Sequence, residues 1–133
     1  QSRPVGYAVH ETAHSSAPSR FMIWSGIFLL FYIVYHVLHF TFGVHPNFNP
    51  DDIYANIVIG FQQTPVAIVY FLAMISLGFH LHHGVFSLFQ TLGLTHPKYN
   101  CWRKCLARAA GWLIPLGYSL IPAAVIAGVL TVK

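Results

Sequence analysis

The stretch Phe-Tyr-Ile-Val-Tyr-His-Val-Leu-His-Phe, residues 31–40, contains two histidines inside a long apolar run. A second run, Gly-Phe-His-Leu-His-His-Gly at residues 78–84, contains three more. An ionisable side chain in the hydrocarbon layer of a membrane is costly, so its presence there indicates a functional site. A neutral imidazole suits that layer when a metal takes its lone pair. The two runs therefore predict a haem or metal centre held between membrane helices.

Long apolar segments decide the fold class. A membrane-spanning helix needs about 20 mostly apolar residues, and three segments qualify, at residues 21–42, about 64–94 and about 107–132. The chain has 133 residues, of which 56% are hydrophobic and 8% charged, and this excludes an ordinary soluble domain. The alternating segments typical of a membrane barrel are absent from the sequence. We therefore predict an all-α membrane protein, with an inner-side loop at residues 1–20 and a transmembrane helical domain at residues 21–133.

The charged residues predict the orientation of the helices. Basic residues precede the first span and occupy the connection between the second and third: Arg3, Arg20, Lys98, Arg103, Lys104 and Arg108. The connection between the first and second spans contains Asp51 and Asp52 but no Lys or Arg. The positive-inside rule then places the start of the chain and the second connection in the cytoplasm or matrix, and Lys133 outside. The net charge of +4 is thus a topology signal, and we expect no nucleic-acid partner.

The start of the chain predicts further helices. No charged segment followed by an apolar one comes after Gln1, so we expect no signal peptide. The opening residues are typical of a loop between helices, and three helices alone make a thin bundle. We expect the remaining helices to come from another chain or from a missing N-terminal part. Cys101 and Cys105, four residues apart on the inner side, are interpreted as ordinary thiols.

Helical spacing gathers the polar residues of each span on one face. In the first span they follow steps of seven, four and three: Ser25, Tyr32, His36 and His39. In the second span the steps are four, three and four: His80, Gly84, Ser87 and Thr91. Both faces should point into the bundle, because lipid does not solvate polar groups. A third face is more typical of helix packing and consists of Gly111, Pro115, Tyr118 and Pro122.

His80 and Gly84 form a pattern typical of a membrane haem site. A b-type haem takes an axial imidazole from each of two facing helices, and a glycine one turn away leaves room for the ring edge. His36 is the matching candidate in the first span. At a rise of roughly 1.5 Å per residue, His36 lies about 9 Å and His80 about 20 Å from the outer ends of their helices. That offset is too large for one haem, so we predict two haems, each with its second ligand elsewhere.

Two glycine–histidine patterns carry a family resemblance. His36 lies ten residues after Gly26, and Gly84 and Gly93 lie four and thirteen residues after His80. These segments resemble the cytochrome b membrane anchor of succinate dehydrogenase and fumarate reductase, of the single-polypeptide, five-helix, di-haem kind. The resemblance covers nearly the whole chain as the last three helices of that family. It implies an up-and-down bundle of five transmembrane helices.

The resemblance also implies cofactors, partners and an activity. His36 corresponds to the ligand of the outward, distal haem b, and His80 to that of the proximal haem b, nearer the iron–sulfur subunit. The family passes electrons between a flavoprotein subunit, an iron–sulfur subunit and a membrane quinone, often menaquinone in the di-haem kind. Succinate chemistry takes place on the flavoprotein. We expect the chain in a bacterial cytoplasmic membrane, with the mitochondrial inner membrane as the alternative.

Further residues are candidates for the cofactor site. Ser25, Ser87 and Gln90 lie toward the inner ends of their spans, where they would hydrogen-bond a quinone carbonyl or a haem propionate, or else only a neighbouring helix. We expect His39 to form a hydrogen bond near the outer surface, and His83 is the alternative ligand in the second span. The family's other two haem ligands, and a carboxylate near its quinone site, lie on its first two helices, which this sequence does not contain.

Two other functions compete with electron transfer. A membrane di-iron lipid desaturase or hydroxylase also uses clustered histidines, but in larger number, near one membrane face and with HxxxH and HxxHH spacings. A helical scaffold whose histidines only stabilise packing leaves two inward polar faces unexplained. A visible absorption spectrum separates the three functions, because only b haems give paired Soret and alpha bands.

Overall fold

The computed structural model describes residues 21–44, 48–94 and 96–132. These residues form α-helices and one short 3-10 helix: α2 (Met22–Phe40), α3 (Ile53–Gln62), α4 (Thr64–Thr91), η1 (Pro97–Tyr99) and α5 (Asn100–Ile126). No strand occurs in the described ranges. The predicted all-α fold is therefore confirmed, while the loop expected at residues 1–20 lies outside the described residues.

Three helical segments are long and apolar enough to cross a membrane: α2, α4, and η1 together with α5. This confirms the three predicted spans. Helix α5 starts at Asn100, before the apolar run that begins near residue 107, because the single turn Pro97–Tyr99 leads directly into it. It ends at Ile126, and Gly128 just beyond has a φ of 72°, the left-handed conformation that commonly ends a helix.

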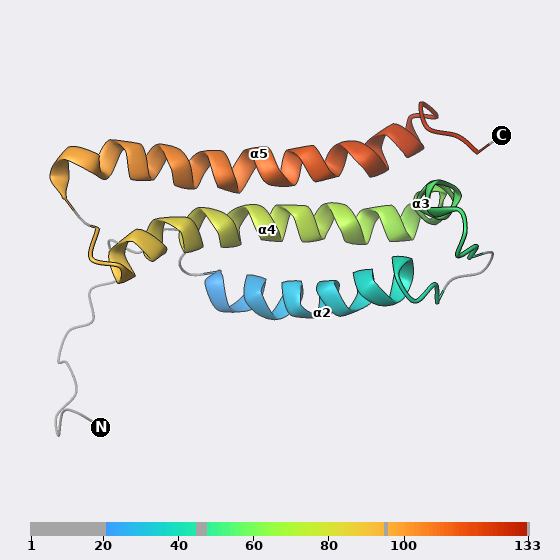
Figure 1. The fold of residues 1–133 in the computed structure, drawn as a ribbon, viewed down its shortest axis with the longest axis horizontal. Helices are drawn as coiled ribbons and strands as arrows, with labels where there is room; N and C mark the ends of the chain where they lie inside the picture. Colours follow the sequence, from blue (N-terminus) through green and yellow to red (C-terminus); the bar gives the residue numbers. More distant parts are fainter. Residues whose placement is uncertain (1–20, 45–47, 95, 133) are drawn as a thin grey trace, which may run out of the picture.

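Helix α4 lies between α2 and α5, and the three run side by side (Figure 1). The contact of α4 with α5 is the more extensive of the two. It is closest where Gly78 faces Gly111, since a Cβ on either glycine would lie 2.8 Å from the other residue's carbonyl oxygen. Small residues that let two backbones approach are typical of helix packing in membranes. Pro115 and Pro122 are buried in the same face of α5, which therefore serves packing.

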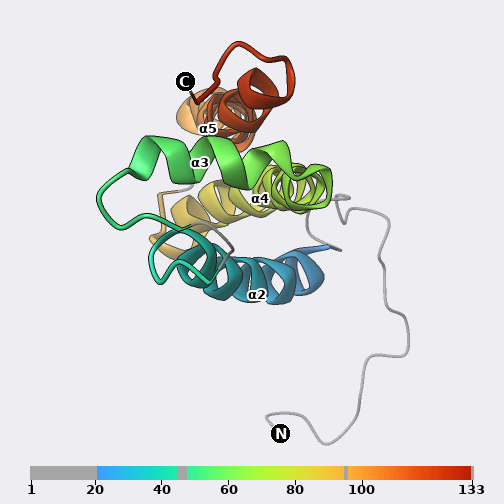
Figure 2. The same cartoon turned by 90° about the vertical axis from the view of Figure 1, so that its right-hand side faces the viewer.

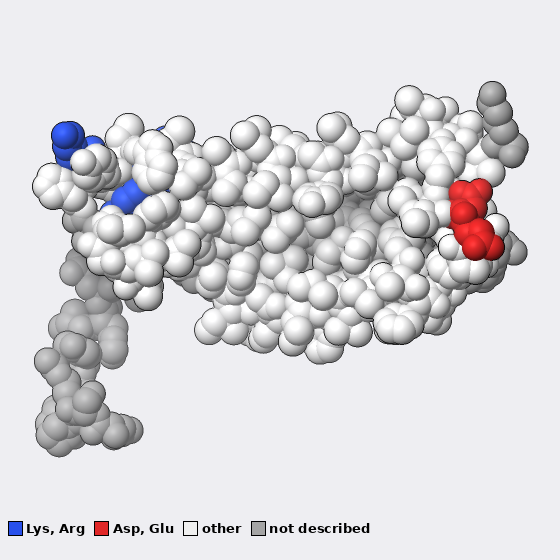
Figure 3. Space-filling model, viewed as in Figure 1, with Lys and Arg blue, Asp and Glu red and all other residues white. Residues whose placement is uncertain are grey.

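The charges gather at opposite ends of the long helices (Figure 3). The described basic residues lie where α4 ends and α5 begins, and they are Lys98, Arg103, Lys104 and Arg108. Asp51 and Asp52 lie at the other end. This arrangement agrees with the topology predicted from the positive-inside rule, so the basic end is called the inner end below and the acidic end the outer end. Arg3, Arg20 and Lys133 lie outside the described residues.

Helix α3 crosses the outer end of the bundle rather than running along it (Figure 2). Asp52 caps this helix, because its carboxylate accepts a hydrogen bond from the backbone N–H of Ala55 at 2.9 Å. Val58 and Phe61 on α3 are buried against Tyr70 on α4, in the main hydrophobic cluster of the chain. A cluster of buried hydrophobic residues therefore lies at the outer end.

Candidate functional site

His80 is held at the inner half of α4 by a serine on α2. Its Nδ1 lies 3.1 Å from Oγ of Ser25, and that hydroxyl also donates a hydrogen bond to the carbonyl oxygen of Met22 at 3.0 Å. A serine hydroxyl has a single proton, and the carbonyl can only accept it. The bond between His80 and Ser25 therefore runs from Nδ1–H to Oγ. This leaves the lone pair of His80 on Nε2, the form that a metal ligand needs.

Two glycines make room around the His80 ring. A Cβ on Gly26 of α2 would lie 3.4 Å from Cε1 of His80, so the bare backbone lets the imidazole lie against the helix. One turn after His80, a Cβ on Gly84 would meet only the flexible tip of Met22, at 3.8 Å. The backbone of Gly84, where a macrocycle edge was predicted to approach, therefore has only the tip of the Met22 side chain beside it.

A second histidine cluster lies in the outer half, around the hydroxyl of Tyr70. Nδ1 of His36 and Nδ1 of His39, one turn apart on α2, each lie 3.2 Å from this oxygen. Tyr70 belongs to α4 and is 5% exposed, and His39 is also 5% exposed. Both predicted histidines of the first span therefore face α4, as their spacing required, and His39 hydrogen-bonds to Tyr70.

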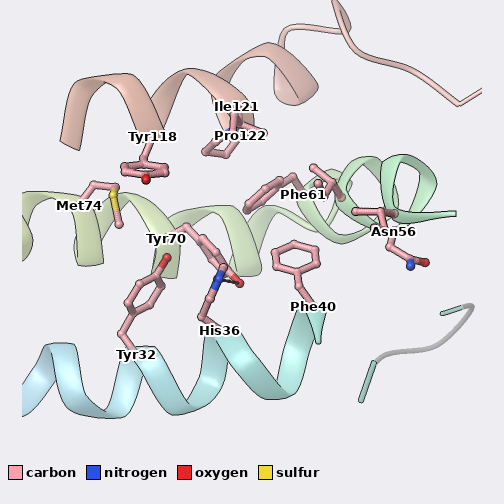
Figure 4. A pocket seen from close by; sticks show the side chains of 12 residues that line it. Tyr32, His36, Phe40, Asn56, Phe61, Tyr70, Met74, Tyr118, Ile121 and Pro122 are labelled. Atoms are coloured by element: carbon pink, nitrogen blue, oxygen red, sulfur yellow. Dashed lines mark hydrogen bonds between the residues drawn. The ribbon is translucent and has the colours of Figure 1, made fainter. Parts of the chain in front are cut away.

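His36 also lines a cavity of about 240 Å³ (Figure 4). The walls come from α2, α3, α4 and α5 and are mostly apolar: Tyr32, His36, Phe40, Ile53, Asn56, Ile57, Phe61, Tyr70, Met74, Tyr118, Ile121 and Pro122. Aromatic rings pack closely behind it, with Tyr70 edge-on to Phe61 at 4.8 Å and to Tyr32 at 5.2 Å between ring centroids. This packing fixes the Tyr70 hydroxyl where both histidines reach it.

The two clusters lie at different depths in the membrane. Tyr70 and His80, which mark them on α4, are ten residues apart in the sequence. At the rise of an α-helix this corresponds to about 15 Å. Because α2 runs antiparallel to α4, Ser25 meets His80 and His36 meets Tyr70. The offset predicted between His36 and His80 is therefore present in the packed helices.

Three other predicted site residues belong to neither histidine cluster and lie toward the inner end of α4: His83, Ser87 and Gln90. The side chains of His83, Ser87 and Gln90 make no hydrogen bond to another residue in the described ranges. His82 lies toward α5, where its Cβ would be 2.8 Å from a Cβ placed on Gly111. Their predicted roles toward a cofactor or quinone stay predictions. Ser25, by contrast, has its hydroxyl engaged by His80 and the backbone.

Two residues of consequence were not identified from the sequence. Tyr70 is the one hydrogen-bonding side chain between Thr64 and Ser76 in the apolar first turns of α4, and that isolation was its only signal. Arg103 counted only as a topology charge, yet it is 4% exposed. Neither role follows from spacing within one helix, because both depend on which helix packs alongside.

The donor set fits a haem better than a metal held by the chain alone. No group of three or more histidine, cysteine or carboxylate side chains in the described ranges is placed to hold a metal ion. His36 and His80 each use Nδ1 for a hydroxyl, and their Nε2 atoms make no hydrogen bond in the described part. A single Nε2 at each of two positions along the bundle suits the axial ligation of a haem at each position.

Comparison with known proteins agrees with this geometry. Residues 7–115, most of the chain, match the family described as the succinate dehydrogenase/fumarate reductase transmembrane subunit. No curated protein and no solved structure matches the chain.

Proposed function

Because this chain belongs to the transmembrane subunits of succinate dehydrogenase and fumarate reductase, we propose that it carries electrons between the iron–sulfur subunit and a membrane quinone. Two b haems in the complete anchor would be the carriers, as in the five-helix, di-haem kind. The flavoprotein subunit performs the succinate chemistry. The proposed location is a bacterial cytoplasmic membrane, and a mitochondrial inner membrane is the alternative.

The observation that carries this proposal is the pair of histidines at two depths, each with Nδ1 bonded to a hydroxyl. Such a bond fixes the ring orientation and directs Nε2 to a metal. His80 would hold the inner haem and His36 the outer one, and each haem iron would gain and release one electron at a time. The second axial ligand of each would come from further helices of the anchor, in the same polypeptide or a separate one.

The quinone would bind at the inner end of the bundle, near the iron–sulfur subunit. Ser87 and Gln90 lie in the last turns of α4, where a quinone carbonyl would find hydroxyl and amide donors. We propose menaquinone as the substrate, in keeping with the di-haem kind. Ser25 is not part of this proposal, because its proton is already used by Met22.

The test is a dithionite-reduced minus oxidised visible spectrum of the isolated native complex, with haem quantified per copy of this chain. We expect two b haems per copy. One haem per copy would overturn the assignment of either His36 or His80. An absence of b-haem bands would overturn the electron-transfer role proposed for this chain.

A further inference from the structure

Tyr70 shares one hydroxyl between two histidines. Its oxygen lies 3.2 Å from Nδ1 of His36 and 3.2 Å from Nδ1 of His39, and it has no other hydrogen-bond partner in the described part of the chain. A phenol has one proton and donates one hydrogen bond, while its oxygen also accepts. With both hydrogen bonds formed, the Tyr70 O–H donates to Nδ1 of one histidine. The other histidine donates its own Nδ1–H to the Tyr70 oxygen.

This constraint makes the two neutral histidines opposite tautomers. The histidine that donates carries its proton on Nδ1 and keeps a lone pair on Nε2. The histidine that accepts carries its proton on Nε2, where it cannot bind a metal. From this geometry we infer that Tyr70 is a positioning residue that makes His36 the ligand and excludes His39, an inference that rests on the proposed haem function.

Packing decides which histidine takes which role. The ring of His39 is 5% exposed, stacked at 13° and 5.4 Å on Tyr35, and 4.2 Å from the ring of Phe40. The ring of His36 lies on the wall of the outer cavity (Figure 4). Only His36 therefore presents a ring edge to a planar group in that cavity. Tyr70 then donates to His39 and accepts from Nδ1–H of His36.

A hydrogen bond from Nδ1–H makes an axial imidazole a stronger electron donor, which favours the oxidised metal. Removing the Tyr70 oxygen should therefore raise the midpoint potential of the outer haem. The inner haem, about 15 Å away along α4, should keep its potential.

The experiment is a potentiometric titration of the two haems in the intact complex with Tyr70→Phe, followed by visible and EPR spectra. Tyr35→Phe is the matched control, because it removes a hydroxyl that makes no hydrogen bond in the described residues while keeping a ring beside His39. We expect an upward shift of one potential in Tyr70→Phe and none in Tyr35→Phe.

The outcomes separate this inference from the proposed function. If the wild-type complex contains two b haems and Tyr70→Phe leaves both potentials and the EPR spectrum unchanged, the role of Tyr70 is wrong and the haem assignment stands. Equal shifts in Tyr70→Phe and Tyr35→Phe would also overturn it, because the hydroxyl would then not be the cause. Absence of haem in the wild-type complex would overturn the proposed function itself.

A second, independent observation concerns Arg103 at the inner end of α5. The side chain is 4% exposed, and its Nε and Nη2 atoms are buried without a hydrogen-bond partner. Its guanidinium lies over the rings of Phe86, at 4.9 Å, and Phe89, at 6.0 Å. The aromatic faces and the C-terminal dipole of α4 favour a cation there, but they leave its N–H donors unpaired. A buried charge without hydrogen-bond partners destabilises the fold.

The Arg103 side chain forms part of a cavity of about 450 Å³ at the inner membrane surface. The other walls are Phe89, Gly93, Leu94, His96, Tyr99 and Trp102. Tyrosine and tryptophan favour the headgroup level of a membrane, and Lys98, whose Nζ lies 5.8 Å from the centroid of the Tyr99 ring, adds positive charge beside the cavity. We propose that this cavity binds the phosphate group of an anionic phospholipid, which Arg103 recognises through its planar fork.

The test uses the native complex in detergent, with phosphatidylglycerol, phosphatidylcholine or inorganic phosphate added, and measures thermal stability and retained lipid phosphorus. We expect phosphatidylglycerol to raise the Tm of the wild-type complex more than phosphatidylcholine does, and Arg103→Gln to remove that difference. Arg103→Lys, which keeps the charge, should retain the fold and only part of the effect. Lys104→Gln, at an exposed position nearby, is the control.

Stabilisation by inorganic phosphate that depends on Arg103 would support the anion site but overturn a lipid as its occupant. Equal responses of the wild-type complex and Arg103→Gln would overturn the site, and so would a loss of response in Lys104→Gln as large as that in Arg103→Gln. Stabilisation of every variant by phosphatidylcholine alone would also overturn it, because a neutral headgroup lacks the net negative charge that Arg103 is proposed to select.

Discussion

At both the inner and the outer site a histidine Nδ1 is hydrogen-bonded to a hydroxyl. The two sites differ in which group decides the ring nitrogen that carries the proton. At the inner site the proton of Ser25 goes to a backbone carbonyl, so His80 has only one way to bond. At the outer site Tyr70 stands between two imidazoles, His36 and His39, each of which can donate or accept. The backbone decides the inner tautomer, and side-chain packing decides the outer one.

This difference predicts unequal sensitivity. The inner site has one histidine and one hydroxyl, so a substitution there removes a single interaction. At the outer site the Tyr70 hydroxyl bonds two histidines, so a substitution of Tyr70 removes two interactions. Matched substitutions at the two sites therefore test two ways of holding a histidine ring. One uses a hydroxyl that donates to a backbone carbonyl, and the other uses a hydroxyl shared by two histidines.

The largest effect should come from removing the ligands. We expect His80→Leu to lose the inner haem and His36→Leu to lose the outer one, each leaving one b haem per chain by pyridine haemochrome assay. His82→Leu, which changes a histidine that faces α5, should keep both haems. If both haems remain in His36→Leu or in His80→Leu, that histidine is not a ligand.

The second-largest effect should weaken the inner and outer histidine sites together. A Cβ on Gly78 would lie 2.8 Å from the carbonyl oxygen of Gly111, so Gly78→Ala forces α4 and α5 apart at a cost of about 1–3 kcal/mol. We expect a lower Tm of the complex and parallel loss of both haems on heating. Gly117→Ala on α5, where nothing lies within 4 Å, is the control and should not lower the Tm. Loss of one haem only would contradict this account.

A third, smaller effect should appear at the inner histidine site only. Ser25→Ala removes the acceptor for Nδ1–H of His80, and loss of such a partner typically weakens metal binding by about tenfold. The inner haem should then show a raised midpoint potential, while the outer haem keeps its own. Ser119→Ala, which removes a hydroxyl bonded only to the carbonyl of Pro115, is the control. A shift of the outer potential in Ser25→Ala would refute the independence of the two sites.

The smallest effect should reach the outer site through α3. Asp52→Ala removes the N-cap bond to Ala55 and should destabilise α3 by about 1 kcal/mol. Because Ile53 and Ile57 of this helix line the outer cavity, hydrogen exchange should rise in α3 and the outer haem should dissociate at slightly lower temperature. Asp51→Ala, whose side chain makes no hydrogen bond in the described residues, is the control. Equal exchange in the two variants would contradict the capping role.

Several features were predictable because they are local properties of the chain. Apolar length alone indicated the three spans. The unequal depths of His36 and His80 followed from the helical rise. The extent of α5 was not predicted, because its first turns are polar and only the preceding Pro97 turn starts the helix there.

The sequence by itself determined the class of protein and the separation of the two histidine sites along the helices, because hydropathy and helical period act within single segments. Only the tertiary structure decided which nitrogen of each histidine is engaged. Ser25 and His80 are 55 residues apart in the chain, and His36 and Tyr70 are 34 apart. A hydrogen bond across such a distance exists only when two helices pack in one register, and no spacing within either helix specifies that register.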